Sequence, residues 1–493
     1  MHMSNVKQET VSGAKWLLLE KVTMQPLQFL YSMVLARLIT PEEMGIVGLT
    51  AVFFALASTL ATAGFGSALI RKINRTEIDC DTAFWFNLGM SALLSAALFL
   101  AAPWFVEFYC QGELLWLTRC SALMMLLSST AGIHWTLYSA QRNFKIRAII
   151  QSVSILISMP VCLLLAYKGF GVWALMIGNI VSSMVSLIWV WIVSPWKPRW
   201  RFSIISFNDL FAFGSKLTVA SLISTIYNHL RTFIIGKFYS PADLGMYTKG
   251  DRLSMVFPTT ITGILGTVTY PILSTLQNDK SRLTDIYRKY IKVSTLPIVW
   301  GCMLIAALAE PIVGFCFGDT WLPCVIFVQL GSIAMMFDHV SVINLNLLYV
   351  LGRSDLVLRL EIIKKTICVL MVLYAATISV TAMCAVSVVY GQIAILLNTY
   401  YTGKMIGLTW WKQQKDYWPY IVASAIASIP AYVVTGLDLP YVVMLLIGGC
   451  SSIFIYLIIL IVKKDKALLE YLPIIERKVH YRWMRVISNY IRK

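Results

Sequence analysis

A twelve-residue phrase occurs twice in the sequence, as ARLITPEEMGIV over residues 36–47 and as GKFYSPADLGMY over residues 236–247. Both copies have a small residue, a base, two bulky residues, a hydroxyl, a proline, an acid and a glycine in the same order. Long apolar segments precede the copies, and each opens with glycine, a small residue and lysine, at 13–15 and at 214–216. A duplicated membrane protein is the simplest explanation, and such repeats are typical of transporters.

The composition supports a membrane location. The chain is 58% hydrophobic and 13% charged, with a mean hydropathy of +0.73, whereas a soluble domain carries about 25% charged residues. Apolar runs of about 20 residues recur along the chain, which predicts an all-α polytopic membrane protein. The first run is longer than the core of a signal peptide and has no cleavage motif, so we expect it to remain as the first span.

The hydropathy pattern predicts about fourteen transmembrane helices joined by short connections. We place them at 15–38, 43–69, 82–106, 112–140, 147–167, 170–194, 208–236, 243–275, 290–312, 322–350, 356–379, 381–403, 416–436 and 440–462. The connections are too short to build a soluble core.

Basic residues accumulate in every second connection. These connections lie near residues 71–75, 142–147, 197–201, 280–289, 353–359 and 404–415. The positive-inside rule then places both termini in the cytoplasm. It also explains the net charge of +17 as a feature of topology, so we expect no nucleic acid partner.

The shift of 200 residues between the two phrases crosses six predicted helices, an even number, so the two copies share one orientation. We therefore expect two parallel six-helix repeats around a central cavity, followed by two further helices. The expected domains are an N-terminal lobe at 1–200, a C-terminal lobe at 201–405, helices 13 and 14 at 406–462, and a basic amphipathic cytoplasmic tail at 463–493. Such a tail is suited to a surface of anionic lipid, and the alternative is a frayed basic tail.

Two predicted helices carry matching polar stripes. Helix 1 places Lys21, Gln25, Gln28 and Ser32 on one face, and helix 7 places Ser221, Thr225, Asn228 and Thr232 at the same positions plus 200. Helical spacing brings each set onto a single face. A shared water-filled cavity explains both stripes, and the alternative is hydrogen bonding between helices inside a packed bundle.

Bases outnumber acids inside the predicted spans. The candidates for a cationic cavity are Arg119, Arg231, Lys249 and Arg252 in the outward half and Lys21 and Lys216 in the inward half. Charges at this depth normally face a cavity or one another. A positive cavity suits an anion, and pyrophosphate is the strongest match for arginine and lysine donors. For each base, pairing with a neighbouring acid is the alternative.

Asp338 and His339 are adjacent in predicted helix 10, which makes them a candidate site for coupling to protons or sodium ions. Pairing of Asp338 with a base from another helix is the alternative. The ten cysteines are scattered without a C-x-x-C motif, and no Walker motif is present. We therefore expect no metal site and no cofactor, and we expect that the chain does not itself use ATP.

Several short phrases resemble a known family. They are Ser12 to Trp16, Ala36-Arg37 with Pro41 to Gly45, Gln141 to Phe144, Phe213-Gly214, Tyr270-Pro271 and Phe317 to Trp321. Their order and spacing resemble polysaccharide flippases of the MOP (multidrug/oligosaccharidyl-lipid/polysaccharide) superfamily. The sequence is most similar to the Wzx type, which serves colanic acid and related exopolysaccharides. The resemblance covers nearly the whole chain.

The resemblance implies a function. A flippase of this type moves an undecaprenyl-pyrophosphate-linked oligosaccharide across the bacterial inner membrane by alternating access. It serves the synthesis of exopolysaccharide, O-antigen or capsule. The partners implied are this lipid-linked oligosaccharide and membrane lipids, and a polysaccharide polymerase or glycosyltransferase complex is a further candidate.

Three alternatives remain at this stage. A cation-coupled multidrug exporter of the same superfamily would need an acidic, aromatic cavity, and the span charges here have the opposite sign. A membrane polymerase or ligase would need a long periplasmic loop, which the sequence lacks, so we do not expect an enzyme. A non-catalytic component of a polysaccharide assembly complex would not need the polar stripes.

Overall fold

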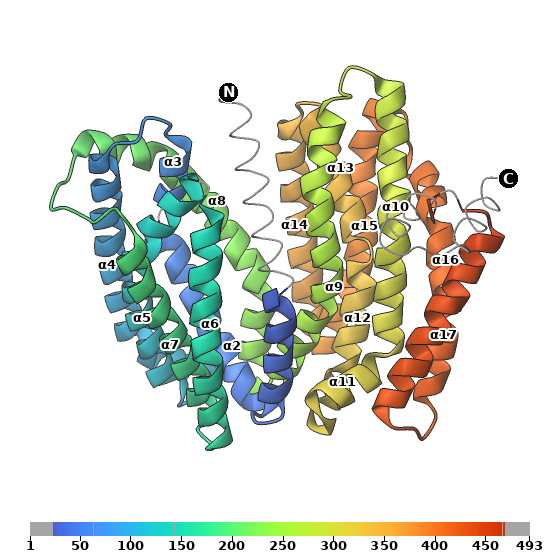
Figure 1. Ribbon diagram of the computed structural model, residues 1–493, viewed down its shortest axis with the longest axis horizontal. Coiled ribbons are helices and arrows are strands. Elements are labelled where there is room, and N and C mark those ends of the chain that lie inside the picture. The colour runs from blue at the N-terminus through green and yellow to red at the C-terminus, as the bar shows by residue number, and fades with distance from the viewer. Residues whose placement is uncertain (1–22, 63, 142, 466, 469–493) are drawn as a thin grey trace. The chain divides into compact units, whose positions relative to one another are not determined.

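The computed structural model describes residues 23–62, 64–141, 143–465 and 467–468. Within these ranges the chain folds into helices without β-strands, which confirms the predicted all-α class. The helices form two compact units, Met1–Gly245 and Met246–Lys493 (Figure 1).

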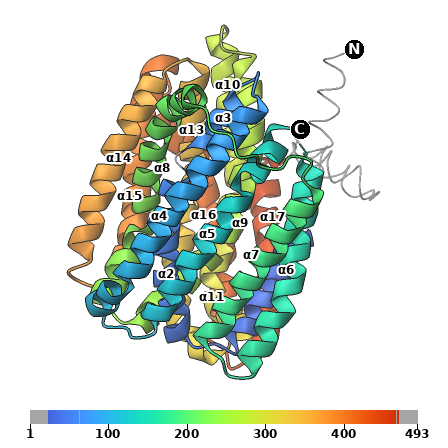
Figure 2. The same ribbon diagram turned by 90° about the vertical axis from the view of Figure 1, so that its left-hand side faces the viewer.

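In the first unit, residues 23–36 are helical. The elements that follow are α2 (Pro41–Ala61), α3 (Phe65–Arg71), α4 (Glu77–Tyr109), α5 (Leu114–Ala140), α6 (Phe144–Tyr167), α7 (Val172–Val193) and α8 (Ile204–Phe238). The antiparallel neighbours α4 and α5 pack together, as do α6 and α7 (Figure 2). Although the repeat assigns α8 to the second lobe, this helix packs against α2, α3 and α4.

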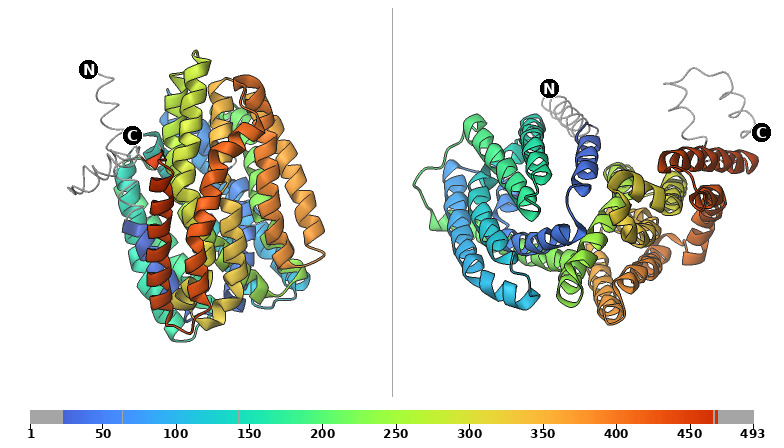
Figure 3. Two further views of the ribbon diagram at one scale, coloured as in Figure 1. Left: turned by 90° about the vertical axis from the view of Figure 1, so that its right-hand side faces the viewer. Right: turned by 90° about the horizontal axis from the view of Figure 1, so that it is seen from below.

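The second unit begins inside α9 (Pro241–Ser274). It continues with α10 (Lys280–Ala307), α11 (Ala309–Phe317), η1 (Asp319–Cys324), α12 (Val325–Met335), α13 (Asp338–Val350), α14 (Ser354–Ala375), α15 (Val380–Ile406), α16 (Trp410–Thr435) and α17 (Tyr441–Val462). Helix α16 packs between α10 and α17 (Figure 3). The Asp416 carboxylate of α16 accepts two hydrogen bonds of 2.7 Å from Arg288 of α10 and lies 3.1 Å from Lys292.

Eleven helical segments of the described chain are long and apolar enough to cross a membrane. They include Asp319–Val350 as one segment and agree with eleven of the expected spans. Of the other three expected spans, 15–38 begins outside the described residues. The remaining two, 243–275 and 356–379, correspond to α9 and α14, which carry several charged residues. The chain is thus a polytopic membrane protein, as predicted.

The repeated phrase forms the same local structure twice. In the first copy Thr40 caps α2, and its hydroxyl accepts the backbone N–H of Glu43 while the Glu43 carboxylate accepts the N–H of Thr40. In the second copy Ser240 and Asp243 make the same reciprocal pair before α9. Both are capping boxes, which satisfy backbone donors that a helix start leaves unpaired. The hydroxyl, proline and acid shared by the two phrases therefore encode a helix start.

Three predicted helices are interrupted in the structure. The span expected at 43–69 breaks at Gly64, the one at 290–312 breaks at Leu308, and the one at 322–350 breaks at residues 336–337. Gly64 has a φ of 68°, a conformation that favours glycine. Hydropathy alone does not register such breaks, because the flanking residues stay apolar.

Candidate functional site

A pocket of about 560 Å³ opens at one end of the first unit, between α3 and the first turns of α8. Five polar or charged residues line it, namely Arg71, Lys72, Asn74, Asp209 and Lys216. Its volume falls within the range of about 300–1,000 Å³ that is usual for small-ligand sites. Figure 1 shows α3 and the connection from α7 to α8 at this end of the unit. The pocket is therefore the candidate functional site that the described part of the first unit supports best.

The bend at Gly64 brings α3 against α8. A side chain at Gly64 would overlap the backbone carbonyl of Gly214, so the two segments approach closely at these glycines. Beyond the bend, Phe65 and Leu69 are fully buried in one cluster with Leu210 of α8. This apolar contact fixes one wall of the pocket against the other, because burial of large apolar side chains strongly favours a single arrangement.

Lys72 is neutralised inside the pocket wall. Its Nζ lies 3.0 Å from Asp79 and 3.1 Å from Asp209. The hydrogen bond to Asp79 raises the pKa of Lys72 above its usual value, and the contact with Asp209 adds to this effect. Lys72 therefore joins the α3–α4 connection to α8, and it adds little net charge to the pocket.

Arg71 and Lys216 carry the surplus charge. Both side chains are exposed, and neither forms an ion pair with any described acid. The Arg71 guanidinium lies over the Phe213 ring, 4.4 Å from its centre, in a cation–π contact. The ring supports the guanidinium from one side and leaves its N–H edge available. An anion entering this pocket would thus meet two cations that no described acid pairs, in a group whose three bases outnumber its two acids by one.

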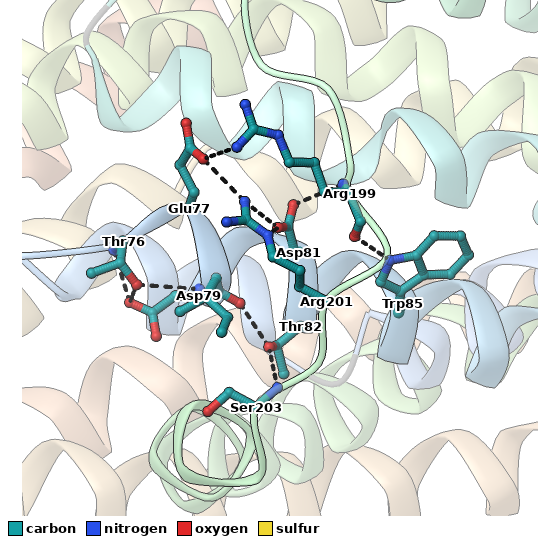
Figure 4. Close-up of polar contacts among 10 residues, drawn as sticks. Thr76, Glu77, Asp79, Asp81, Thr82, Trp85, Arg199, Arg201 and Ser203 are labelled. Atoms are coloured by element: carbon teal, nitrogen blue, oxygen red, sulfur yellow. Dashed lines mark hydrogen bonds and ion pairs between the residues drawn. The ribbon is translucent and has the colours of Figure 1, made fainter.

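A polar network holds the α7–α8 connection against the start of α4 (Figure 4). Asp81 is 0% exposed, and its carboxylate accepts the backbone N–H of Arg199 at 3.1 Å and Nε of Arg201 at 2.8 Å. Glu77 accepts from both arginines at 3.1 and 3.0 Å. Because this connection leads directly into α8, the network sets where α8 begins.

Two further contacts strengthen this junction. The indole of Trp85 donates to the carbonyl of Arg199 at 2.8 Å and stacks on Trp200 with ring centres 3.9 Å apart. The hydroxyl of Thr82 accepts the backbone N–H of Ser203, the residue that caps α8 (Figure 4). Arginines 199 and 201 are thus structural, although the sequence placed them simply among topogenic charges.

The predicted cationic residues fall in different places. Arg119 lies on α5 with its guanidinium over the rings of Phe99 and Trp116, at 4.7 and 5.1 Å. Its Nε is buried without a hydrogen-bond partner in the described chain. Arg231 lies on α8 and is half-buried. Lys21 lies outside the described residues, and Lys216 belongs to the α3–α8 pocket.

In the second unit, Lys249 and Arg252 follow each other on one face of α9. Lys249 is 5% exposed, and its ammonium lies 4.2 Å from the ring centre of Phe317 and 5.6 Å from that of Trp321. Arg252 is exposed. Whether these residues share a cavity with Arg119 and Arg231 stays a prediction.

Some residues of the two polar stripes are exposed, and others form hydrogen bonds. Gln25, Gln28 and Asn228 are exposed, and Ser32 and Thr232 are half-buried. The hydroxyl of Thr225 lies 3.2 Å from that of Thr59 on α2 and donates to the Ser221 carbonyl at 2.9 Å. Thr225 thus takes part in the interhelical bonding that was the alternative to a cavity.

The two residues of the candidate ion-coupling site, Asp338 and His339, lie in different surroundings. His339 is 1% exposed, and its Nε2 lies 2.8 Å from the Thr295 hydroxyl of α10. Asp338 is half-buried at the start of α13. The ammonium of Lys364 on α14 interacts with the Asp338 carboxylate through charge alone. The ion pair of Lys364 is with Glu361, at 2.6 Å. An ion-coupling role stays a prediction.

Sequence reasoning missed Arg71, Asn74 and Asp209 as members of one pocket. It assigned Arg71 and Lys72 to topology, because the expected helix at 43–69 ran straight to them. The glycine at position 64 was the available signal, since a break there turns the end of the segment back toward α8.

Comparison with known proteins identifies the family. Residues 34–326, more than half of the chain, match the family described as "Polysaccharide biosynthesis protein". The chain belongs to this polysaccharide biosynthesis protein family. The resemblance stated from sequence phrases is thereby confirmed.

Curated relatives of this family member are identical to it at about a quarter of the aligned positions. The succinoglycan biosynthesis transport protein ExoT of Rhizobium meliloti is 25% identical over 309 residues, which span 62% of each chain. The teichuronic acid biosynthesis protein TuaB of Bacillus subtilis is 23% identical over 72% of this chain and 74% of its own. The lipopolysaccharide biosynthesis protein WzxC of Escherichia coli is 22% identical over 73% of this chain and 74% of its own.

Solved structures show the fold of this family member. The lipid II flippase MurJ, in an inward closed conformation, superposes with a TM-score of 0.70 over 93% of this chain and 100% of its own, at 13% identity. An inward-facing multidrug resistance MATE transporter of the MOP superfamily reaches 0.56 over 77% of this chain and 94% of its own, at 16% identity. The chain thus shares its fold with these two proteins.

Proposed function

We propose that the protein is a flippase for an undecaprenyl-pyrophosphate-linked oligosaccharide, which it moves from the cytoplasmic to the periplasmic leaflet of the bacterial inner membrane. The observation that carries the proposal is the family match over residues 34–326 in a chain of membrane-spanning helices. The names of ExoT, TuaB and WzxC refer to the biosynthesis of succinoglycan, teichuronic acid and lipopolysaccharide, and that of ExoT also to transport. The substrate would serve exopolysaccharide, O-antigen or capsule synthesis.

Transport would proceed by alternating access. A pyrophosphate cannot cross hydrocarbon unaided, because removing its charges from water costs far more than thermal motion supplies. A hydrated cationic path would lower this cost while the polyprenyl chain stays in lipid. The basic residues Arg119, Arg231, Lys249 and Arg252 are the proposed contacts along this path, and Asp338 with His339 is the proposed site of ion coupling.

We also propose the domain organisation that the sequence predicts. Lobes at 1–200 and 201–405 would form parallel repeats, and the capping boxes at Thr40 and Ser240 support a common ancestry of α2 and α9. The alternating basic connections support termini in the cytoplasm. The amphipathic tail at 463–493 lies almost wholly outside the described residues.

Reconstitution of the full chain into vesicles tests the function. The substrate is a fluorescent undecaprenyl-pyrophosphate oligosaccharide present in both leaflets, and a membrane-impermeant quencher reports the fraction in the outer one. We expect the quenched fraction to rise toward completeness with the protein and to stay at the outer-leaflet value without it.

Two outcomes would contradict the proposal. In the first, the protein leaves the quenched fraction unchanged. In the second, it does not move the lipid-linked sugar and instead exports a cationic dye when an ion gradient is applied. The second outcome would support the multidrug exporter. Deletion of the gene in the native host gives an independent readout, since lipid-linked glycan should accumulate while surface polysaccharide disappears.

A further inference from the structure

We propose that the pocket between α3 and α8 binds the pyrophosphate of a polyprenyl lipid at the cytoplasmic membrane surface, where substrate is captured before it crosses. This inference rests on the proposed function and assigns its first step to a site of its own. It is carried by the charge, shape and surroundings of the pocket.

The charge of the pocket suits a doubly charged anion. Three cations line it, but Lys72 is already neutralised by Asp79 and Asp209. Arg71 and Lys216 remain without an acidic partner in the described chain. A diester of pyrophosphate carries one negative charge on each phosphate. The three bases outnumber the two acids by one, and Arg71 and Lys216 are the two bases that neither acid pairs. Each phosphate of a pyrophosphate diester could contact one of them, whereas a phosphodiester offers a single charged phosphate.

The donors are held in place from different helices. Arg71 ends α3 and rests on the Phe213 ring of α8, while Lys216 comes from α8 itself. Asn74 adds an exposed amide on the connection that follows α3. Arginine offers a planar fork to one phosphate, and lysine offers a mobile point charge to the other. Because buried side chains already pack α3 against α8, binding would not require this wall to fold first.

The rim of the pocket indicates a ligand borne by lipid. Ile73, which lines the pocket, is 92% exposed, and Ile205, one helical turn before Asp209, is 84% exposed. Trp200 does not line the pocket, but it is 87% exposed on the connection that leads into α8. Exposed apolar and aromatic side chains beside bases are typical of the interface between membrane and water. A lipid could place its pyrophosphate in the pocket and keep its chain among these residues.

Binding of lipids to the full-length protein in nanodiscs tests the site. Native mass spectrometry would compare an undecaprenyl-pyrophosphate-linked oligosaccharide, undecaprenyl phosphate and phosphatidylglycerol. We expect the pyrophosphate lipid to bind best to the wild type and its affinity to fall about tenfold in Arg71→Gln or Lys216→Gln and further in the double variant. Arg75→Gln is the matched control, because Arg75 lies on the same connection but does not line the pocket.

A second variant keeps the test independent of folding defects. Asn74→Asp adds a negative charge at an exposed loop position, so it should weaken binding while leaving the thermal unfolding temperature unchanged. Wild-type affinity in the double variant, an equal loss in Arg75→Gln, or equal binding of phosphatidylglycerol would each overturn the proposal.

The outcomes separate this inference from the proposed function. If vesicles flip the lipid-linked sugar but the pocket variants bind the pyrophosphate lipid normally, the pocket assignment fails and the function stands. If the variants lose binding but the wild type moves no substrate, the pocket stands and the transport function fails.

Discussion

Gly45 and Gly245 face each other reciprocally in the structure. A side chain at Gly45 would overlap the carbonyl of Pro241, and one at Gly245 would overlap the carbonyl of Pro41. The backbone nitrogen of each glycine lies within 3.2 Å of the position that a β-carbon on the other would take. The glycine near the end of each copy of the repeated phrase thus lets the first turns of α2 and α9 touch. The two copies meet through the residue they share.

We predict that Gly45→Ala and Gly245→Ala each destabilise the protein by about 1–3 kcal/mol, because the new methyl group meets backbone that cannot rotate away. Thermal unfolding of the purified protein in detergent measures this as a drop of a few degrees. Gly89→Ala is the control, since nothing lies within 4 Å of its added β-carbon, and alanine favours the helix. Equal unfolding temperatures for Gly45→Ala and Gly89→Ala would contradict the contact.

Asp81→Asn should lower the free energy of unfolding by about 1–3 kcal/mol, because hydrogen bonds to a buried carboxylate are among the stronger ones. Asp81 is fully buried and holds both Arg199 and Arg201. Glu77→Gln is the matched control: its side chain is 59% exposed, so its ion pairs should contribute about 1 kcal/mol at most. Thermal unfolding of both variants decides the point. A larger loss in Glu77→Gln than in Asp81→Asn would show that the network is not centred on Asp81.

We expect Arg119→Gln to reduce transport in vesicles by about tenfold or more, because a contact between two charged groups is replaced by a weaker one. The protein should remain folded, since the guanidinium makes only ring contacts in the described chain. Arg353→Gln serves as control, because Arg353 is exposed and pairs with Asp355. Normal transport together with a lower unfolding temperature would instead assign Arg119 a structural role.

Charge reversal at Arg231 or Arg252 should abolish export in cells without lowering the amount of protein in the membrane. A carboxylate at either position would repel a pyrophosphate on the proposed path. Surface polysaccharide and immunoblots of membrane fractions provide the two readouts. Lys168→Glu, at an exposed position after α6, controls for reversal of any surface charge. Full export by both arginine variants would remove the idea of a cationic cavity.

The sequence predicted the fold well because its strongest signals are local. Apolar runs of bilayer length, the repeated helix start and the alternating basic connections all lie within short stretches. The candidate site was harder, since it depends on where helices bend. Gly64 sits inside an unbroken apolar run, yet its backbone turns α3 toward α8. Only that turn brings Arg71 into one pocket with Lys216, residues that are 145 positions apart in the chain.

The periodicity of the sequence also could not predict which charged residues form ion pairs. The sequence treated the bases at 71–75 and 197–201 as equivalent markers of topology. In the structure Arg199 and Arg201 are bound to acids of α4, whereas Arg71 is not. The partners lie more than a hundred residues away, so no local pattern distinguishes the two groups.

The length of α8 has a consequence for when the pocket would operate. Its 35 residues rise about 52 Å, whereas the hydrocarbon core of a bilayer measures about 30 Å. With this excess at its first turns, α8 would place Asp209 and Lys216 toward the headgroup layer, in contact with water and mobile ions. Attraction there is screened over about 8 Å at physiological ionic strength. Substrate capture should therefore weaken as potassium chloride is added, while contacts deeper in the membrane should not respond.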